Sequence, residues 1–305
     1  MNAQTGFDRP ARDEPEGFLV EIVPGERIHF LDWGRPDPAA AVPSILLVHG
    51  LSATGWSWTP VARRLNHVAR VVAVDLRGHG LSDAPTSGYT QDQLAEDVIA
   101  VAEGSGLLAA AEGRVLLVGH GYGGIVAAWT AARLGARCAG LILVDGGWED
   151  LAAETGMTPD EWLRDLEEPP GVLRSMTAFL ADRRDFDPPS WDADQEQAAR
   201  STVVEVPAGK VVSAVRPHAL AGSVEAIFAY DPAATLPMVL APIVAIVAGG
   251  AEVEGKRAAL AGVDAVRRAA GLAAIRVVDL GNAGHNLMRY RPDDVAATIL
   301  AAARS

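Results

Sequence analysis

The sequence predicts an α/β fold: a mainly parallel sheet of eight strands with helices on both faces. Short, continuous runs of apolar residues recur along the chain, which is typical of strands buried on both faces. Helical stretches separate these runs, and a regular alternation of strand and helix indicates parallel pairing. The 305 residues are 49% hydrophobic and 21% charged, as in an ordinary globular protein.

The expected elements follow from local patterns. Strands at 18–23 and 27–33 flank the turn signal Pro24-Gly25-Glu26, so they should form an antiparallel hairpin at one edge. Six further strands are expected from apolar runs, at 45–48, 71–74, 115–118, 141–144, 243–247 and 275–278. Helices are expected from apolar residues at helical spacing, at 90–103, 125–134, 254–270 and 293–303.

Residues 147–237 do not follow this alternation of strands and helices. They contain no clear buried strand, but they hold helical pieces at 159–167 and 172–181 and several aromatic residues. We interpret the segment as a cap inserted over the strand ends. The expected domains are therefore a flexible tail (1–16), an α/β core (17–146 and 238–305) and the cap (147–237).

Composition excludes several classes of function. The net charge of −13 and the absence of a basic stripe argue against binding to nucleic acid or to an anionic membrane. No apolar run is long enough to span a bilayer, and the first 17 residues lack the apolar core of a signal peptide, so a cytoplasmic location is expected. The single cysteine, Cys138, is expected to be a buried thiol. Nothing in the sequence predicts the oligomeric state.

One motif predicts where the reacting residues lie. The strand at 114–118 runs into Gly119-His120-Gly121-Tyr122-Gly123-Gly124 and then into a buried helix. This pattern resembles the nucleophile elbow G-x-S-x-G in its strand–turn–helix context. The flanking glycines are needed because the strand and helix backbones nearly touch. The central residue, where a serine nucleophile is expected, is Gly121, which has no side chain to attack a substrate.

Three other motifs, in the order expected along the chain, complete a resemblance to the α/β-hydrolase superfamily. His49-Gly50 follows a buried strand, as the HG oxyanion loop does, and residues 75–82 read D-x-R-G-x-G-x-S. Gly284-His285 follows the last strand, at the place of the catalytic histidine. The resemblance covers roughly residues 18–146 and 240–305. It implies a fold and a kind of chemistry, but it does not identify a substrate.

The resemblance also implies roles for individual residues. His285 would be the general base, and the backbone N–H groups of Leu51 and Tyr122 would form the oxyanion hole. The acid that orients His285 has two candidate locations: Asp145, after the strand at 141–144, or Glu252 and Glu254, after the strand at 243–247. Asp145 is preferred, because the later segment lacks the usual aspartate and some family members place the acid after the earlier strand.

Other residues near the strand ends have plainer expected roles. Trp148 is the preferred substrate-contacting residue, because it lies at the mouth of the expected cap. Three histidines, His49, His79 and His120, are expected to hydrogen-bond the backbone around the turns. Their spacing matches no zinc motif, so neither a metal nor another cofactor is expected. Asp75 is expected to be a structural hydrogen-bonding residue.

Gly121 leaves three hypotheses open. In the first, it replaces a serine and inactivates a hydrolase of carboxylic esters or lactones that acts through an acyl-enzyme. In the second, glycine is native and the protein binds small molecules without covalent catalysis. In the third, His285 and Asp145 act directly on water or substrate. The first is preferred, because an intact elbow beside an unused Asp–His pair would be an odd relic. An aspartate at position 121, which would favour epoxide or haloalkane chemistry, is also absent.

The cap sequence limits the expected substrate. It contains Trp, Phe, Met and Leu residues and few obvious cationic anchors, so an apolar, uncharged ester or lactone fits better than a charged one. Certain fungal-toxin lactonases of the superfamily are similar in placing the acid after the earlier strand, which makes a macrolactone one possible substrate.

Overall fold

The computed structural model describes residues 11–34, 42–109, 113–166, 174–250 and 253–304. The main sheet has eight strands: β1 (Glu16–Val23), β2 (Glu26–Asp32), β3 (Ser44–Val48), β4 (Val71–Val74), β5 (Val115–His120), β6 (Cys138–Val144), β9 (Ile243–Val247) and β10 (Arg276–Asp279). Their order is β1-β2-β4-β3-β5-β6-β9-β10. The β1–β2 and β2–β4 pairs are antiparallel and the other pairs are parallel, which confirms the predicted fold class.

Twelve α-helices are found in the described residues. They are α1 (Thr59–Leu65), α2 (Gln91–Gly104), α3 (Tyr122–Leu134), α4 (Leu151–Thr155), α5 (Pro159–Leu166), α6 (Met176–Phe186), α7 (Ala193–Ser201), α8 (Pro217–Phe228), α9 (Pro232–Thr235), α10 (Val253–Ala269), α11 (Leu287–Tyr290) and α12 (Pro292–Ala303). Short 3₁₀ turns lie at Gly55–Trp58, Gly135–Arg137, Pro188–Ser190 and Leu236–Met238.

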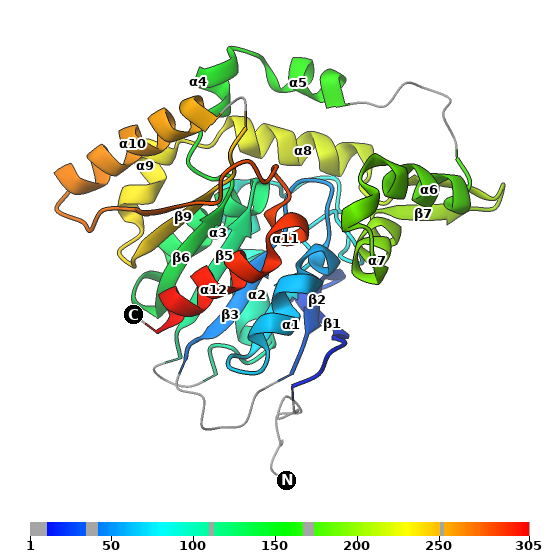
Figure 1. Ribbon diagram of the computed structural model, residues 1–305, viewed down its shortest axis with the longest axis horizontal. Helices are drawn as coiled ribbons and strands as arrows, with labels where there is room; N and C mark the ends of the chain where they lie inside the picture. The colour runs from blue at the N-terminus through cyan, green and yellow to red at the C-terminus, as the bar shows by residue number, and fades with distance from the viewer. Residues whose placement is uncertain (1–10, 35–41, 110–112, 167–173, 251–252, 305) are drawn as a thin grey trace, which may run out of the picture.

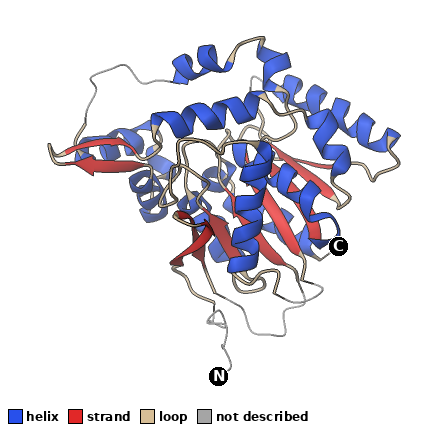
Figure 2. Ribbon diagram, turned by 180° about the vertical axis from the view of Figure 1, so that it is seen from behind, coloured by secondary structure: helices blue, strands red, loops and turns tan. Residues whose placement is uncertain are grey.

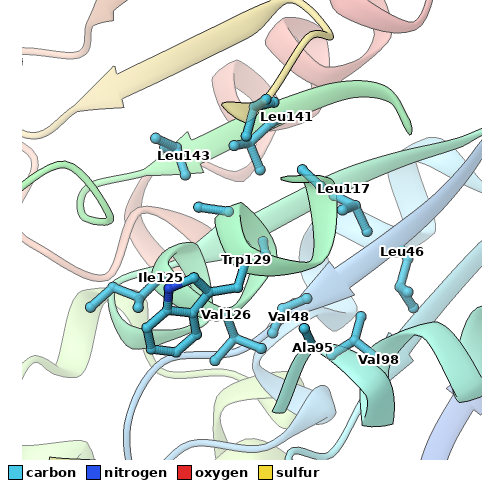
Figure 3. Packing of buried hydrophobic residues seen from close by; sticks show 14 of the residues in the cluster. Leu46, Val48, Ala95, Val98, Leu117, Ile125, Val126, Trp129, Leu141 and Leu143 are labelled. Carbon is cyan, nitrogen blue, oxygen red and sulfur yellow. The ribbon is translucent and has the colours of Figure 1, made fainter. Parts of the chain in front are cut away.

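The sheet is buried on both faces, which explains the continuous apolar runs. Alternate residues of each central strand point to opposite sides. On one side, Leu46, Val48 and Leu117 pack with residues of α2 and α3 (Figure 3). On the other side, Ile45 and Leu47 pack with residues of α1 and α12. The helices therefore form two layers with the sheet between them (Figures 1 and 2).

The segment expected to be a cap lies beyond the carboxyl ends of the strands (Figure 1). It contains α4 to α9 and an antiparallel hairpin of β7 (Val203–Val206) and β8 (Lys210–Ser213) that the sequence did not predict. The helix expected at 172–181 is instead α6, because the Ser175 side chain accepts a hydrogen bond from the N–H of Ala178 and caps the helix start. Residues 167 and 172–173 of the expected helices lie outside the described residues.

Several polar contacts attach this segment to the core, and three of them involve α7 or the turns beside it. Arg63 of α1 pairs with Asp194 of α7 at 2.8 Å. The hydroxyls of Thr54 and Ser201 are 2.6 Å apart. Arg289 of α11 donates to the hydroxyl of Ser190 at 2.6 Å. These bonds fix α7 and its neighbours beside the loops that carry the predicted site.

Two expectations about the chain as a whole can be compared with the structure. Cys138, at the start of β6, is buried as predicted, and burial raises the pKa of its thiol to about 11. Within the described residues, we find no helix with the length and apolar character needed to cross a bilayer.

Candidate active site

A sharp turn joins β5 to α3. The strand ends at His120 and the helix begins at Tyr122, so Gly121 alone makes the turn. Its φ of 51° and ψ of −119° lie in a region that side-chain-bearing residues rarely adopt. The N–H of Gly121 donates to the carbonyl of Val144 at 3.1 Å, and the Gly121 carbonyl accepts from the N–H of Gly124 at 2.8 Å. The turn therefore has the geometry of a nucleophile elbow.

The glycines on either side are required by close packing, as the sequence predicted. A Cβ added at Gly119 would overlap the backbone of Gly123. A Cβ added at Gly123 would overlap the carbonyl oxygens of Val48 and His49. The strand and the helix thus cross at a distance that only glycine allows.

Position 121 differs from these glycines, because a Cβ there would overlap no backbone atom. An ideal Cβ at Gly121 would lie 3.4 Å from His285 Nε2 and 3.6 Å from His285 Cε1. Both are ordinary van der Waals distances. A serine side chain would fit beside the imidazole, with its hydroxyl within hydrogen-bonding reach of Nε2.

His285 lies next to Asp145, which follows β6. His285 Nδ1 donates a hydrogen bond to Asp145 Oδ2 at 2.7 Å, because an ionised carboxylate can only accept one. The Nε2 lone pair consequently faces position 121. The Asp145 side chain is completely buried, whereas that of His285 is 60% exposed. Asp145 also has a positive φ of 46°, a strained conformation of the kind found at functional sites.

Two further donors bind the Asp145 carboxylate. The N–H of Ala248 donates to Oδ1 at 2.9 Å, and Lys256 Nζ lies 2.8 Å from Oδ2. Burial opposes ionisation, but the hydrogen bonds from His285, Lys256 and Ala248 outweigh it and hold the pKa of Asp145 below its ordinary value. Asp145 is therefore an anion at neutral pH.

The alternative acid candidates do not occupy this position. Glu254 is exposed and pairs with Arg257 at 3.0 Å on the outer side of α10. Glu252 lies outside the described residues. Among the described candidates, Asp145 is the one that contacts His285.

A cavity of about 970 Å³ opens in front of Gly121 and His285. Leu51 and Tyr122, whose N–H groups were predicted to form the oxyanion hole, both line it. We find no hydrogen bond within the described residues that uses either N–H. Most of the remaining wall is apolar and includes Ile125, Leu151, Trp162, Ile227 and Met288.

Trp148 corrects an expectation from the sequence. It was predicted to contact substrate, but its side chain is fully buried in the core and is absent from the cavity wall. Its indole N–H donates to the carbonyl of Lys256 at 3.1 Å, which removes the polar cost of burying the ring. Trp162 is the tryptophan that reaches the cavity.

The other histidines hydrogen-bond the backbone, as predicted. His49 Nδ1 donates to the carbonyl of Gly50 at 2.8 Å, and His79 Nδ1 donates to that of Arg77 at 3.0 Å. Asp75 accepts hydrogen bonds rather than facing the cavity. No group of His, Cys, Asp and Glu side chains in the described part of the chain could hold a metal ion.

Three further ionisable side chains lie at the site: His120, which was predicted to hydrogen-bond the backbone, and Glu149 and Lys256, which the sequence did not identify. His120 Nε2 donates to the carbonyl of His285 at 3.0 Å, and burial lowers the pKa of His120 to about 3, so it is neutral. Glu149 lines the cavity and accepts from the N–H groups of Gly147 and Trp148, while burial raises its pKa. Lys256 is the third. No sequence pattern separates Glu149 and Lys256 from ordinary surface or turn residues.

Comparison with known proteins agrees with this geometry. The protein-family model described as "Alpha/beta hydrolase family" matches residues 45–298 of this chain. Epoxide hydrolase 4 of Homo sapiens is 33% identical over 143 residues, which cover 43% of this chain and 36% of that protein. A non-heme chloroperoxidase of Streptomyces lividans is 37% identical over 128 residues, or 41% of this chain and 43% of that protein. The chain thus matches less than half the length of these curated relatives.

Solved structures match over nearly the whole chain at low identity. E-2-(acetamidomethylene)succinate hydrolase has a TM-score of 0.73 at 21% identity and covers 95% of this chain and 100% of its own. The enol-lactonase from Burkholderia xenovorans LB400 has a TM-score of 0.64 at 20% identity and covers 94% and 100%. At these identities the likeness shows the fold alone.

The close packing at Gly123 leads to a prediction about stability. Gly123→Ala should lower the free energy of unfolding by about 1–3 kcal/mol or more, because the new methyl group would push β3 and α3 apart. The matched control is Gly262→Ala in α10, where an added Cβ meets no atom within 4 Å. It should raise stability by up to about 1 kcal/mol. Urea unfolding measures both effects. Equal midpoints for Gly123→Ala and the unchanged protein would contradict the steric requirement for glycine at position 123.

Proposed function

The chain belongs to the alpha/beta hydrolase family, and on that premise we propose that its site is built to hydrolyse a carboxylic ester or lactone through an acyl-enzyme when serine occupies position 121. We infer that the chain with Gly121 is an inactivated form of such an enzyme. The observation that carries the proposal is the 3.4 Å separation between an ideal Cβ at position 121 and His285 Nε2.

Each step of the proposed reaction has a residue to perform it. A serine hydroxyl at position 121 would attack the substrate carbonyl while His285 Nε2 takes its proton. The N–H groups of Leu51 and Tyr122 would stabilise the oxyanion, and Asp145 would hold the imidazole and stabilise its charged form. His285 would then protonate the leaving alcohol, and water would hydrolyse the acyl-enzyme by the same route.

The cavity supports an apolar substrate. Its volume of about 970 Å³ is at the large end for a small-molecule site, and apolar atoms make up most of its lining surface. A large acyl group or a macrolactone would fill this space. The resemblance to an epoxide hydrolase carries less weight, because Gly121 supplies no carboxylate to attack an epoxide. A cytoplasmic location remains part of the proposal.

A second candidate function rests on the direction of His285. With Gly121 in place, Nε2 faces the cavity with no protein nucleophile between it and a substrate. A water molecule held there could be activated directly by the Asp145–His285 pair. General-base assistance of this kind is worth about 10²–10⁴-fold, far less than a full nucleophilic mechanism.

Restoring the hydroxyl tests the proposal. Gly121→Ser should raise kcat on short aryl esters by up to about 10⁶-fold, because the missing group is the nucleophile itself. It should also lower the free energy of unfolding by about 1–3 kcal/mol, because serine would adopt the positive φ that glycine accepts freely. Ester hydrolysis and urea unfolding measure the two effects. Gly121→Ala is the control: it adds the same strain without a nucleophile. The acyl-enzyme mechanism would be contradicted if Gly121→Ser showed neither turnover nor labelling by a serine-directed phosphonate.

The choice of acid gives a separate prediction. In the Gly121→Ser protein, Asp145→Asn should lower kcat by about 10⁴-fold with little change in substrate binding, because asparagine favours the wrong imidazole tautomer. Glu254→Gln, which removes a carboxylate on the outer side of α10, is the matched control and should have little effect. A large loss in Glu254→Gln with none in Asp145→Asn would assign the acid to the later strand.

The unchanged protein should bind substrate without turning it over. The cavity and the oxyanion donors do not depend on a side chain at position 121, so an apolar ester should bind reversibly and stay intact. Calorimetry measures the binding, and chromatography of the recovered ester measures hydrolysis. Fast hydrolysis that His285→Ala abolishes would instead favour the water-activating function.

A further inference from the structure

Lys256 lies where the family resemblance led us to consider an acid. It is on α10, which follows β9, and its Nζ is 2.8 Å from Asp145 Oδ2. His285 Nδ1 binds the same oxygen at 2.7 Å. One carboxylate oxygen is therefore shared between an ammonium group and the imidazole.

The rest of the lysine is also held in place. Its carbonyl accepts from the indole N–H of Trp148, which fixes the first turn of α10 against the loop after β6. Its side chain is 21% exposed. It lines both the main cavity and a smaller one of about 230 Å³, which His285 and residues 248–250 also line. The ammonium thus lies between two open spaces, with Asp145 as its nearest anion.

The Lys256 ammonium weakens the electrostatic stabilisation that Asp145 gives to the protonated imidazole of His285. An unpaired carboxylate beside an imidazole strongly favours the protonated ring, because opposite charges attract at short range. A lysine on the same oxygen offsets that attraction and repels the proton on the ring. It also keeps the buried carboxylate ionised and restricts its rotation. The base then loses its proton at a lower pH while keeping the correct tautomer.

We propose that Lys256 is a positioning residue that acts through Asp145: it orients the shared carboxylate and makes His285 available as a neutral base at lower pH than the Asp–His pair alone would. The proposal deepens the proposed function, because it rests on His285 acting as the base. Lys256 itself is assigned no contact with the reacting atoms.

Other ionisable groups around the pair do not take over this role. His120, on β5, packs against His285 with ring centroids 4.4 Å apart, and it is neutral because burial lowers its pKa to about 3. Glu149, after β6, and Glu154, on α4, line the same cavity, and negative charge on either acts against the effect of Lys256; burial raises the pKa of Glu149 and so disfavours its charged form. Among the described residues of the cavity wall, Lys256 is the one lysine or arginine.

The test measures the titration of His285 in the unchanged Gly121 protein, so it needs no catalysis. Imidazole signals are followed by NMR from pH 5 to 9, and the His285 signal is identified by its absence in His285→Gln. Lys256→Met should raise the midpoint of this titration by about one pH unit, because removing the nearby cation favours the charged ring. Lys256→Arg keeps the charge and should leave the midpoint within about 0.3 unit.

A neighbour on the same helix supplies the matched control. Arg257 is next in sequence but pairs with Glu254 and Asp279 on the outer side. Arg257→Met makes the same change of charge and should not move the His285 midpoint. If Lys256→Met does not fold, Lys256→Gln replaces it, with thermal unfolding recorded for every variant.

The outcomes separate cleanly. A raised midpoint in Lys256→Met or Lys256→Gln, absent in Arg257→Met, supports the proposal. An unchanged midpoint in a folded Lys256 variant overturns it and leaves the lysine with a structural role. A lowered midpoint also overturns it, because Lys256 would then favour the charged imidazole, which is the opposite of the proposed effect.

A second measurement links the lysine to activity. In the Gly121→Ser protein, the acid limb of the pH profile of kcat/KM should move up by the same amount in Lys256→Met, while Lys256→Arg restores the original profile. An NMR shift without any turnover by the serine protein would support the role of Lys256 in setting His285 and refute the acyl-enzyme function. Turnover with an unmoved profile would do the reverse.

Discussion

The buried carboxylate of Asp145 is the constraint on which the arrangement of the site depends. A carboxylate removed from water is stable as an anion only when donors surround it. Here an N–H after β9, an ammonium on α10 and an imidazole on the loop after β10 supply those donors. Three segments distant in the sequence are thereby held at the end of β6. The conformation of Asp145, with its positive φ, is maintained by the same bonds.

A second constraint is steric and lies one strand away. The close packing of α3 on β5 requires glycine at position 119, and its packing on the end of β3 requires glycine at position 123, because a Cβ at either would overlap backbone. Position 121, between them, is limited only by its dihedral angles, since a side chain there would enter the cavity beside His285. The packing that shapes the elbow is therefore separate from the residue that would do its chemistry. A glycine at the centre leaves the turn intact and relieves its strain.

The sequence predicted the central sheet closely and the elements of residues 147–237 poorly, for a physical reason. Strands β4 and β9 have the predicted bounds because both of their faces are buried, so the apolar run is as long as the strand. The β7–β8 hairpin was missed because half-exposed residues such as Val204 and Glu205 leave no buried run to detect. Trp148 was misplaced because an aromatic residue near a site is as compatible with the core as with a cavity. Lys256 gave no signal, since a lysine in the first turns of a charged helix is normally solvated.

His285 is the residue whose position the fold does not require. Asp145 keeps two other donors without it, and 60% of the His285 side chain is exposed, so burial of the imidazole contributes little to stability. Its position is nevertheless well determined, by Asp145 on Nδ1 and by His120 on its carbonyl oxygen. Such bonds give an exposed ring one tautomer and one orientation, with a free lone pair on Nε2 aimed at position 121. A structural histidine has no need of that lone pair, whereas a general base depends on it.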